Sequence, residues 1–157
     1  MNGFLRASIS NGVAEEQALI RRWWHEVEHA RGRLVWEYYL EGRYVDAVWF
    51  PGAPGAGEEC DGKNAPARFP LNGAEVVLCE AKRTLSPELV GQALVYAVFA
   101  VRARAQLRET IVFAETGDEA MRSAARDLGL TVVVGTEPPA PANRPPRTEQ
   151  APHKWKS

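Results

Sequence analysis

The chain has 157 residues, of which 45% are hydrophobic, so it is long enough to form one ordinary domain with its own core. Nineteen Lys and Arg balance 20 Asp and Glu, and the net charge of −1 excludes a histone-like polycation but not a local basic face for nucleic acid. Its two cysteines, Cys60 and Cys79, are too few for a disulfide scaffold or a four-cysteine metal site. With no signal peptide and no apolar run long enough to span a membrane, we expect a cytoplasmic protein that does not bind membranes.

Three stretches lack the hydrophobic periodicity of helices and strands. Residues 1–13 contain two Asn-Gly turn signals, which predict a flexible N-terminus. Residues 51–72 contain four prolines and four glycines, which indicate a long surface loop. Residues 136–157 hold six of the eleven prolines and predict a disordered tail. The folded domain is therefore expected at 14–135.

The periodicity within this domain predicts helices and strands in a fixed order. Helical spacing of apolar residues begins at Ala14, and two strands rich in β-formers follow as a hairpin around Glu41-Gly42. Ser86, followed by Pro87, is a strong helix start. The predicted elements are a helix at 14–31, strands at 34–40, 44–50 and 75–81, a helix at 87–104, a strand at 110–114, a helix at 118–128 and a strand at 130–134. This order predicts an α/β sandwich with a mixed central sheet flanked by helices.

Three charged residues interrupt two of the predicted strands. Asp46 lies in the middle of the apolar strand at 44–50, and Glu80 and Lys82 lie at the end of the strand at 75–81. Side chains alternate along a strand, so Glu80 and Lys82 share a face. Two carboxylates from neighbouring strands would form an oxygen site that suits Mg²⁺ or Mn²⁺, and the lysine would serve the attacking water or the developing charge. Each residue alone also fits an exposed strand position or a surface ion pair.

Two polar side chains on the following helix support the same interpretation. Gln92 and Tyr96 are four residues apart and therefore lie on one face of a helix that is otherwise mostly apolar. A glutamine in such a helix needs a partner or a polar cleft. The alternative is that Gln92 bonds to nearby backbone and Tyr96 is a packing residue.

Taken together, Asp46, Glu80-Ala81-Lys82 and Gln92-x-x-x-Tyr96 resemble the PD-(D/E)XK nuclease superfamily, and the Gln-x-x-x-Tyr element resembles its RecB-type branch. The resemblance implies a restriction-endonuclease-like fold with an αβββαβαβ core, and Mg²⁺-dependent hydrolysis of phosphodiester bonds in DNA. It implies that Asp46 and Glu80 ligate the metal, that Lys82 serves the water or the transition state, and that Gln92 and Tyr96 position these groups or contact DNA. It also implies DNA as the partner, with a homodimer or a larger nuclease, helicase or defence complex as a further expectation. The residue before Asp46 is Val45 instead of proline, and the loop at 51–72 is longer than in simple members.

The superfamily often adds an acidic residue from the first helix, and two glutamates qualify. Glu16 shares the apolar stripe of this helix, whereas Glu15 does not, so Glu16 is the expected third metal ligand. Glu16 also fits a residue that only complements the helix dipole. Glu37 is interpreted as a solvated or turn residue, as are Glu26, Glu28 and Glu41. Arg43 and Arg83 are candidate phosphate-binding residues, although each also fits an ordinary surface charge.

Two other functions were weighed. The run His25-Glu26-Val27-Glu28-His29 satisfies the H-E-x-x-H pattern of a zinc peptidase, but it lies on the polar side of the helix and lacks a third ligand other than His153 in the tail. The chain is alternatively a catalytically inactive nuclease-type domain that binds only DNA or protein. The presence of Asp46, Glu80 and Lys82 together favours the nuclease.

Overall fold

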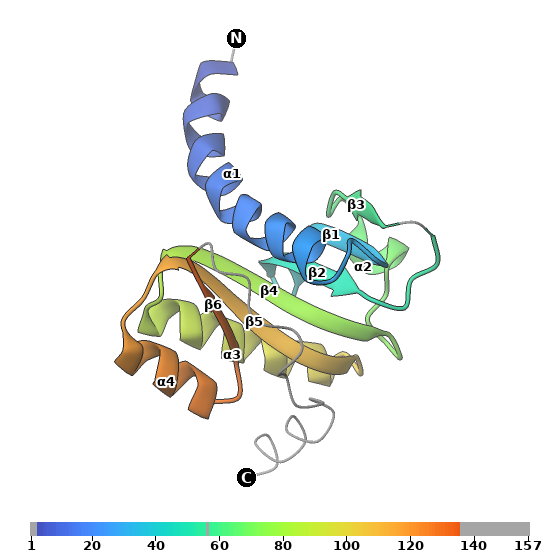
Figure 1. The fold of residues 1–157 in the computed structure, drawn as a ribbon. Coiled ribbons are helices and arrows are strands. Elements are labelled where there is room, and N and C mark those ends of the chain that lie inside the picture. Colours follow the sequence, from blue (N-terminus) through green and yellow to red (C-terminus); the bar gives the residue numbers. More distant parts are fainter. Residues whose placement is uncertain (1–2, 56, 136–157) are drawn as a thin grey trace.

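The computed structural model describes residues 3–55 and 57–135, with side chains from Ala14 onward. Six strands form one sheet in the order β3-β1-β2-β4-β5-β6. The elements in chain order are α1 (Gly3–Glu26), β1 (Arg33–Leu40), β2 (Arg43–Phe50), β3 (Glu58–Cys60), α2 (Ala65–Arg68), β4 (Glu75–Thr84), α3 (Pro87–Arg102), β5 (Gln106–Thr116), α4 (Glu119–Asp127) and β6 (Thr131–Val134) (Figure 1). The predicted α/β fold with a mixed sheet and flanking helices is confirmed.

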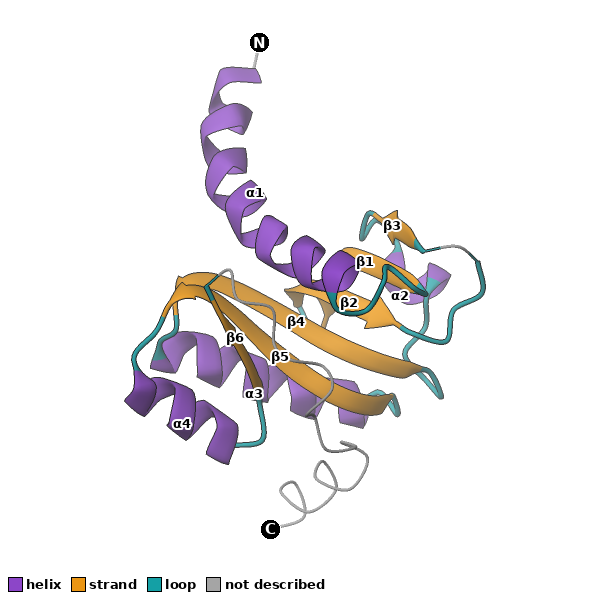
Figure 2. Cartoon of the chain, in the orientation of Figure 1, coloured by secondary structure: helices purple, strands orange, loops and turns teal. Residues whose placement is uncertain are grey.

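The sheet changes from antiparallel to parallel pairing at its centre. Strand β2 is antiparallel to both of its neighbours, β1 and β4, whereas β4, β5 and β6 run parallel to one another and β3 runs parallel to β1 at the edge. Helix α1 covers one face, and α3 and α4 cover the other (Figure 2). Each face therefore has its own core: Trp23 and Trp49 lie in the core under α1, and Leu78 and Tyr96 lie in the core under α3. Strand β4 is buried from both sides, as its apolar sequence predicts.

Helix α1 differs from its predicted bounds at both ends. It begins at Gly3, so residues 3–13, expected as a loose segment, form part of the helix. A glycine such as Gly12 inside a helix costs about 1 kcal/mol relative to alanine but does not end it. The helix stops at Glu26 instead of near Arg31, because the backbone at His29 and Ala30 adopts positive φ angles of 55° and 51°. These angles are incompatible with a right-handed helix.

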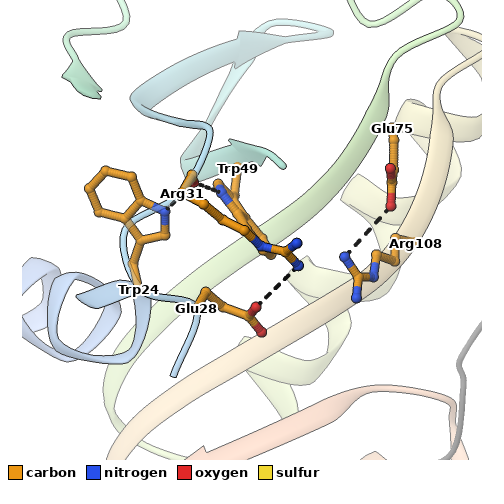
Figure 3. A network of polar contacts seen from close by, with 6 residues as sticks. All are labelled: Trp24, Glu28, Arg31, Trp49, Glu75 and Arg108. Atoms are coloured by element: carbon orange, nitrogen blue, oxygen red, sulfur yellow. Dashed lines mark hydrogen bonds and ion pairs between the residues drawn. The ribbon is translucent and has the colours of Figure 1, made fainter. Parts of the chain in front are cut away.

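Two buried tryptophans hold the turn after α1 (Figure 3). The carbonyl oxygen of Arg31 accepts hydrogen bonds from Trp24 Nε1 at 3.0 Å and from Trp49 Nε1 at 2.7 Å. The Arg31 guanidinium lies over the Trp49 ring and pairs with Glu28 at 3.5 Å. Because one tryptophan belongs to α1 and the other to β2, this turn ties the helix to the middle of the sheet.

The segment at 51–72, predicted as an unstructured loop, contains two short elements. Strand β3 pairs in parallel with β1, and α2 is a single helical turn that follows it. Both are too short to show a periodicity in the sequence, and β3 exists only because β1 offers a free edge.

Elsewhere the predicted elements agree with the observed ones to within a few residues at each end. Ser86 caps α3 by accepting a hydrogen bond from Leu89 N at 3.3 Å, as predicted. Among the described helices, none combines the length and the hydropathy needed to cross a membrane. The tail predicted at 136–157 lies outside the described residues.

Candidate active site

Backbone amides donate hydrogen bonds to the carboxyl groups of Asp46 and Glu80 where β2 and β4 separate. The ladder between these strands runs from Trp49 opposite Val77 to Ala47 opposite Cys79, and Asp46 and Glu80 come next. Beyond Ala47 and Cys79, carboxylate oxygens of the side chains take the place of backbone carbonyls as the hydrogen-bond acceptors between the strands. Asp46 N donates to Glu80 Oε1 at 2.8 Å, and Ala81 N donates to Asp46 Oδ2 at 2.8 Å. The two carboxyl groups are therefore held between the strands by backbone amides.

A matching irregularity lies on the other side of Asp46, in β1. The register of β1 and β2 places Glu37 opposite Asp46, but these two residues do not pair. The backbone of Glu37 has a positive φ of 53°. Trp36 packs in the core under α1, whereas Tyr38, two residues later, packs in the core under α3. Regular strand alternation would place residues on either side of Glu37 on the same face. The strand therefore twists sharply at Glu37, and this twist opens the sheet beside Asp46.

The paired carboxyl groups are electrostatically strained without a cation. Glu80 is 3% exposed, and its burial, followed by repulsion from Asp46, raises its pKa to about 9. The pKa of Asp46 is raised to about 6, mainly by burial; the charges of Glu16 and Glu37 contribute to the rise, and the hydrogen bond from Ala81 opposes it. The Lys82 ammonium opposes the rise in both pKa values. Two carboxyl groups in this position favour either protonation or a bound cation.

A cavity of about 40 Å³ adjoins Asp46 on the α1 side of the sheet. Besides Asp46, its lining includes the acidic residues Glu16 and Glu37, and also Gln17, Ile20 and Ala81. Glu16, the residue chosen from the first helix, therefore lies at the site. Glu15 points elsewhere and forms an ion pair with Arg83 at 3.2 Å.

Glu37, predicted to be a solvated or turn residue, also lies at this site. Its side chain is exposed, as expected, but it also lines the cavity, and partial burial raises its pKa. The signal that identified Asp46, a carboxylate interrupting a β-rich segment, is present at Glu37 as well. It was weaker there because neighbouring positions of that strand are also polar or aromatic.

Lys82 lies on β4 two residues beyond Glu80 and is half-buried. Within the part of the chain that the structure describes, no carboxylate forms an ion pair with its ammonium group. The ammonium is close enough to lower the pKa of both central carboxyls and remains available for a ligand.

Helix α3 brings Tyr96 to the opposite side of the carboxyl pair. Tyr96 is buried, and its pKa is raised by burial and then by the charges of Glu80 and Asp46. Gln92, one turn earlier on α3, is half-buried, and its side chain forms no hydrogen bond with any described residue. Arg43 lies near Tyr96, where it lowers the tyrosine pKa, and its guanidinium stands over the Phe99 ring at 5.8 Å.

Arg83, the second candidate for phosphate binding, is exposed on the α1 side. It pairs with Glu15 and, at 3.9 Å, with Glu115. The structure therefore gathers Glu16, Asp46, Glu80, Lys82 and Tyr96 around one point and leaves Arg83 engaged with two carboxylates beside it.

Within residues 14–55 and 57–135, no three side chains of His, Cys, Asp or Glu lie close enough together to hold a metal ion among them. Asp46 and Glu80 supply two carboxylates, and Glu16 and Glu37 lie across the cavity. This set fits a hard cation that keeps several of its own waters, since Mg²⁺ is commonly bound through one or two carboxylates. It does not fit a closed structural metal site.

The zinc peptidase alternative is contradicted by the backbone. The H-E-x-x-H pattern requires both histidines on one face of a continuous helix. Helix α1 ends at Glu26, His29 has a φ of 55°, and both His25 and His29 are exposed. His153 lies outside the described residues.

No model of a known protein family matches the sequence, and no curated protein matches it. The chain is similar in structure to the crystal structure of a repair endonuclease from Pyrococcus abyssi, with a TM-score of 0.48 and 17% identity, over 78% of this chain and 47% of that one. It is also similar to the structure of an EndoMS-dsDNA2 complex, with a TM-score of 0.46 and 15% identity, over 79% of this chain and 45% of that one. The chain spans about half the length of these structures. The resemblance to the RecB-type branch stays a prediction.

Proposed function

We propose that the chain is a metal-dependent nuclease that hydrolyses phosphodiester bonds in DNA. The observation that carries the proposal is the pair of hydrogen bonds from Asp46 N to Glu80 Oε1 and from Ala81 N to Asp46 Oδ2. They hold the buried carboxyl group of Glu80 and the half-buried one of Asp46 at an opening between strands. A pair of carboxyl groups of this kind is costly unless it serves a charge that arrives with a ligand. Strained ionisable groups of this type cluster at functional sites.

The donor set fits Mg²⁺ or Mn²⁺ better than other cations. All four acidic groups around the site offer oxygen, and the only cysteine on β4, Cys79, packs in the core under α1. In this proposal Asp46 and Glu80 are the direct ligands, and Glu16 and Glu37 act through water on the α1 side. When bound, the cation would supply Lewis acidity and a lowered pKa for an attacking water.

The remaining residues would act on the substrate side of the pair. Lys82 has a free ammonium next to both carboxyls, so it is placed to orient the attacking water or to stabilise negative charge on the phosphate. Tyr96 on α3 would offer its hydroxyl to this pair from the other face, and Gln92, one turn earlier on the same helix, would contact the DNA. Arg43 adds positive charge at the entrance on that side, where a phosphate backbone would approach.

Cleavage of defined nucleic acids tests the proposal. The full chain is incubated with linear, circular, single-stranded and branched DNA, and with RNA, in Mg²⁺, in Mn²⁺ and in excess chelator. We expect cleavage of DNA that requires the metal and stops on chelation. Failure to cleave any DNA in either metal would overturn the proposal.

A further inference from the structure

A second and larger hollow lies beside the candidate active site. It has a volume of about 630 Å³, within the range of small-molecule pockets. One wall is the β1–β2 hairpin, with Glu37, Tyr39 and Tyr44, and the other is the segment between β3 and α2, with Asp61 and Lys63. We call this hollow the tyrosine cleft. Glu37 lines both the tyrosine cleft and the cavity at Asp46, so the two are neighbours.

The hairpin wall of the tyrosine cleft carries an exposed pair of aromatic side chains. Tyr39 and Tyr44 face each other across the hairpin, with their ring centroids 5.6 Å apart at an interplanar angle of 68°. They are 47% and 58% exposed, and they are the only aromatic residues among the large exposed hydrophobics of the described chain. The neighbouring hairpin residues Tyr38, Leu40 and Val45 are buried. The two rings thus form a surface that no described part of the chain covers.

The opposite wall is held in place by local contacts. Gly62 approaches β1 so closely that a Cβ atom there would clash with the carbonyl oxygens of Trp36 and Glu37. Lys63 N donates to Asp61 Oδ1 at 2.9 Å, and Arg68 Nη1 donates to the Lys63 carbonyl at 3.2 Å. Within the described residues, the Lys63 ammonium has no ion-pair partner. A fixed wall with a free ammonium therefore faces the two tyrosine rings.

We propose that the tyrosine cleft binds an unpaired nucleobase of the nucleic acid, next to the phosphate at the carboxyl pair; this inference rests on the proposed nuclease function. Aromatic side chains stack on any base, and an unpaired base has a free face for them. The carboxylates of Glu37 and Asp61 disfavour a phosphate inside the cleft, but they are acceptors for the amino groups on base edges. The Lys63 ammonium at the rim suits the flanking phosphate instead. Paired bases in a duplex have no face free to enter such a cleft.

Base stacking is measured directly with 2-aminopurine, whose fluorescence falls when it stacks. The full chain is titrated, in chelator so that nothing is cleaved, into single-stranded DNA with one internal 2-aminopurine. We expect quenching on binding, with affinity lowered about tenfold in Tyr39→Ala and in Tyr44→Ala. Tyr39→Phe and Tyr44→Phe keep the ring and should bind as the unaltered chain does. Leu128→Ala is a matched control, since Leu128 is also 47% exposed but lies after α4 at the opposite edge of the sheet.

A second readout uses cleavage. In Mg²⁺, the alanine variants should lose activity on DNA with unpaired bases about tenfold more than on fully paired DNA, and the phenylalanine variants should not. Equal affinity and an unchanged cleavage ratio in the alanine variants would overturn the cleft as a base site, as would cleavage by a chain that gives no quenching. Tyrosine-dependent quenching without any cleavage would overturn the nuclease and leave the base site. Absence of both binding and cleavage would overturn both.

Discussion

The two central carboxyl groups receive their hydrogen bonds from backbone amides, so their charge can be removed without removing their position. A glutamine at position 80 keeps an acceptor oxygen for Asp46 N, and an asparagine at position 46 keeps one for Ala81 N. Amide substitutions therefore separate the chemistry of the site from the packing of the strands.

The first prediction concerns activity. Glu80→Gln and Asp46→Asn should each lower Mg²⁺-dependent DNA cleavage more than about 100-fold, because each removes a negatively charged ligand. Circular dichroism and thermal melts should show a folded protein. Glu75→Gln is the matched control, since Glu75 begins the strand that carries Glu80 and pairs with Arg108 at 3.6 Å (Figure 3). Full activity in Glu80→Gln would remove this residue from the mechanism.

The second prediction separates the two glutamates of α1. Glu16 lines the cavity, whereas Glu15 pairs with Arg83 on the surface. Glu16→Gln should lower the cleavage rate about tenfold, the size of effect expected for a residue that acts through a water, and Glu15→Gln should leave it unchanged. Initial rates at saturating Mg²⁺ decide between them. The opposite ranking would show that the helix presents a different face.

The third prediction concerns pH. In the metal-free protein the pKa of Glu80 is raised to about 9 and that of Asp46 to about 6, above their unfolded values near 4. Between about pH 4 and about pH 9 the folded protein therefore binds more protons than the unfolded one. As a result, the free energy of unfolding falls as pH rises through this range. Urea unfolding in chelator should show this decline, and Glu80→Gln should flatten it. A decline of the same slope in Glu80→Gln would place its origin elsewhere.

At the scale of elements, most of the fold follows from patterns within short windows of sequence. The cap at Ser86, the run of β-forming residues in β2 and the spacing of Ile20, Trp23 and Val27 each depend on neighbours along the chain. Strand β3 could not be predicted, because it depends on pairing with β1 and on the approach of Gly62 to that strand.

The candidate site also contains residues that the sequence predicts and one whose role it does not predict. Asp46, Glu80 and Lys82 were identified because they interrupt strands, and the structure brings them together. The part played by Glu37 depends on a left-handed backbone conformation opposite Asp46, which a carboxylate in a β-rich segment does not by itself predict. The register of the β1–β2 hairpin places Glu37 opposite Asp46.

The fourth prediction tests the helix that carries Gln92 and Tyr96. Ser86→Ala leaves the amide of Leu89 without its acceptor and should lower the free energy of unfolding by about 1 kcal/mol. Ser86→Asp should restore the loss, because aspartate is an equally good cap. Chemical denaturation measures both. Equal stability of the alanine variant would mean that the first turn of α3 contributes little.

For the whole molecule, the site lies where the antiparallel strands β1, β2 and β4 meet the parallel strands β4, β5 and β6. Strand β2 separates from β4 at Asp46, while β4 continues alongside β5 as far as Thr84. Helix α1 supplies Glu16 from one face and α3 supplies Tyr96 from the other, so the opening is reached from both layers (Figure 2). The tyrosine cleft extends this opening along the hairpin. The proposed function requires a cation bound between the carboxyl groups of Asp46 and Glu80.

Calorimetric titration of the chelator-treated full chain with Mn²⁺ tests that claim most directly. We expect one Mn²⁺ site in the unaltered protein, loss of that site in both Asp46→Asn and Glu80→Gln, and an unchanged site in Glu75→Gln. A protein that binds no Mn²⁺, or that binds it equally well without the two carboxylates, would rule out a cation site at Asp46 and Glu80.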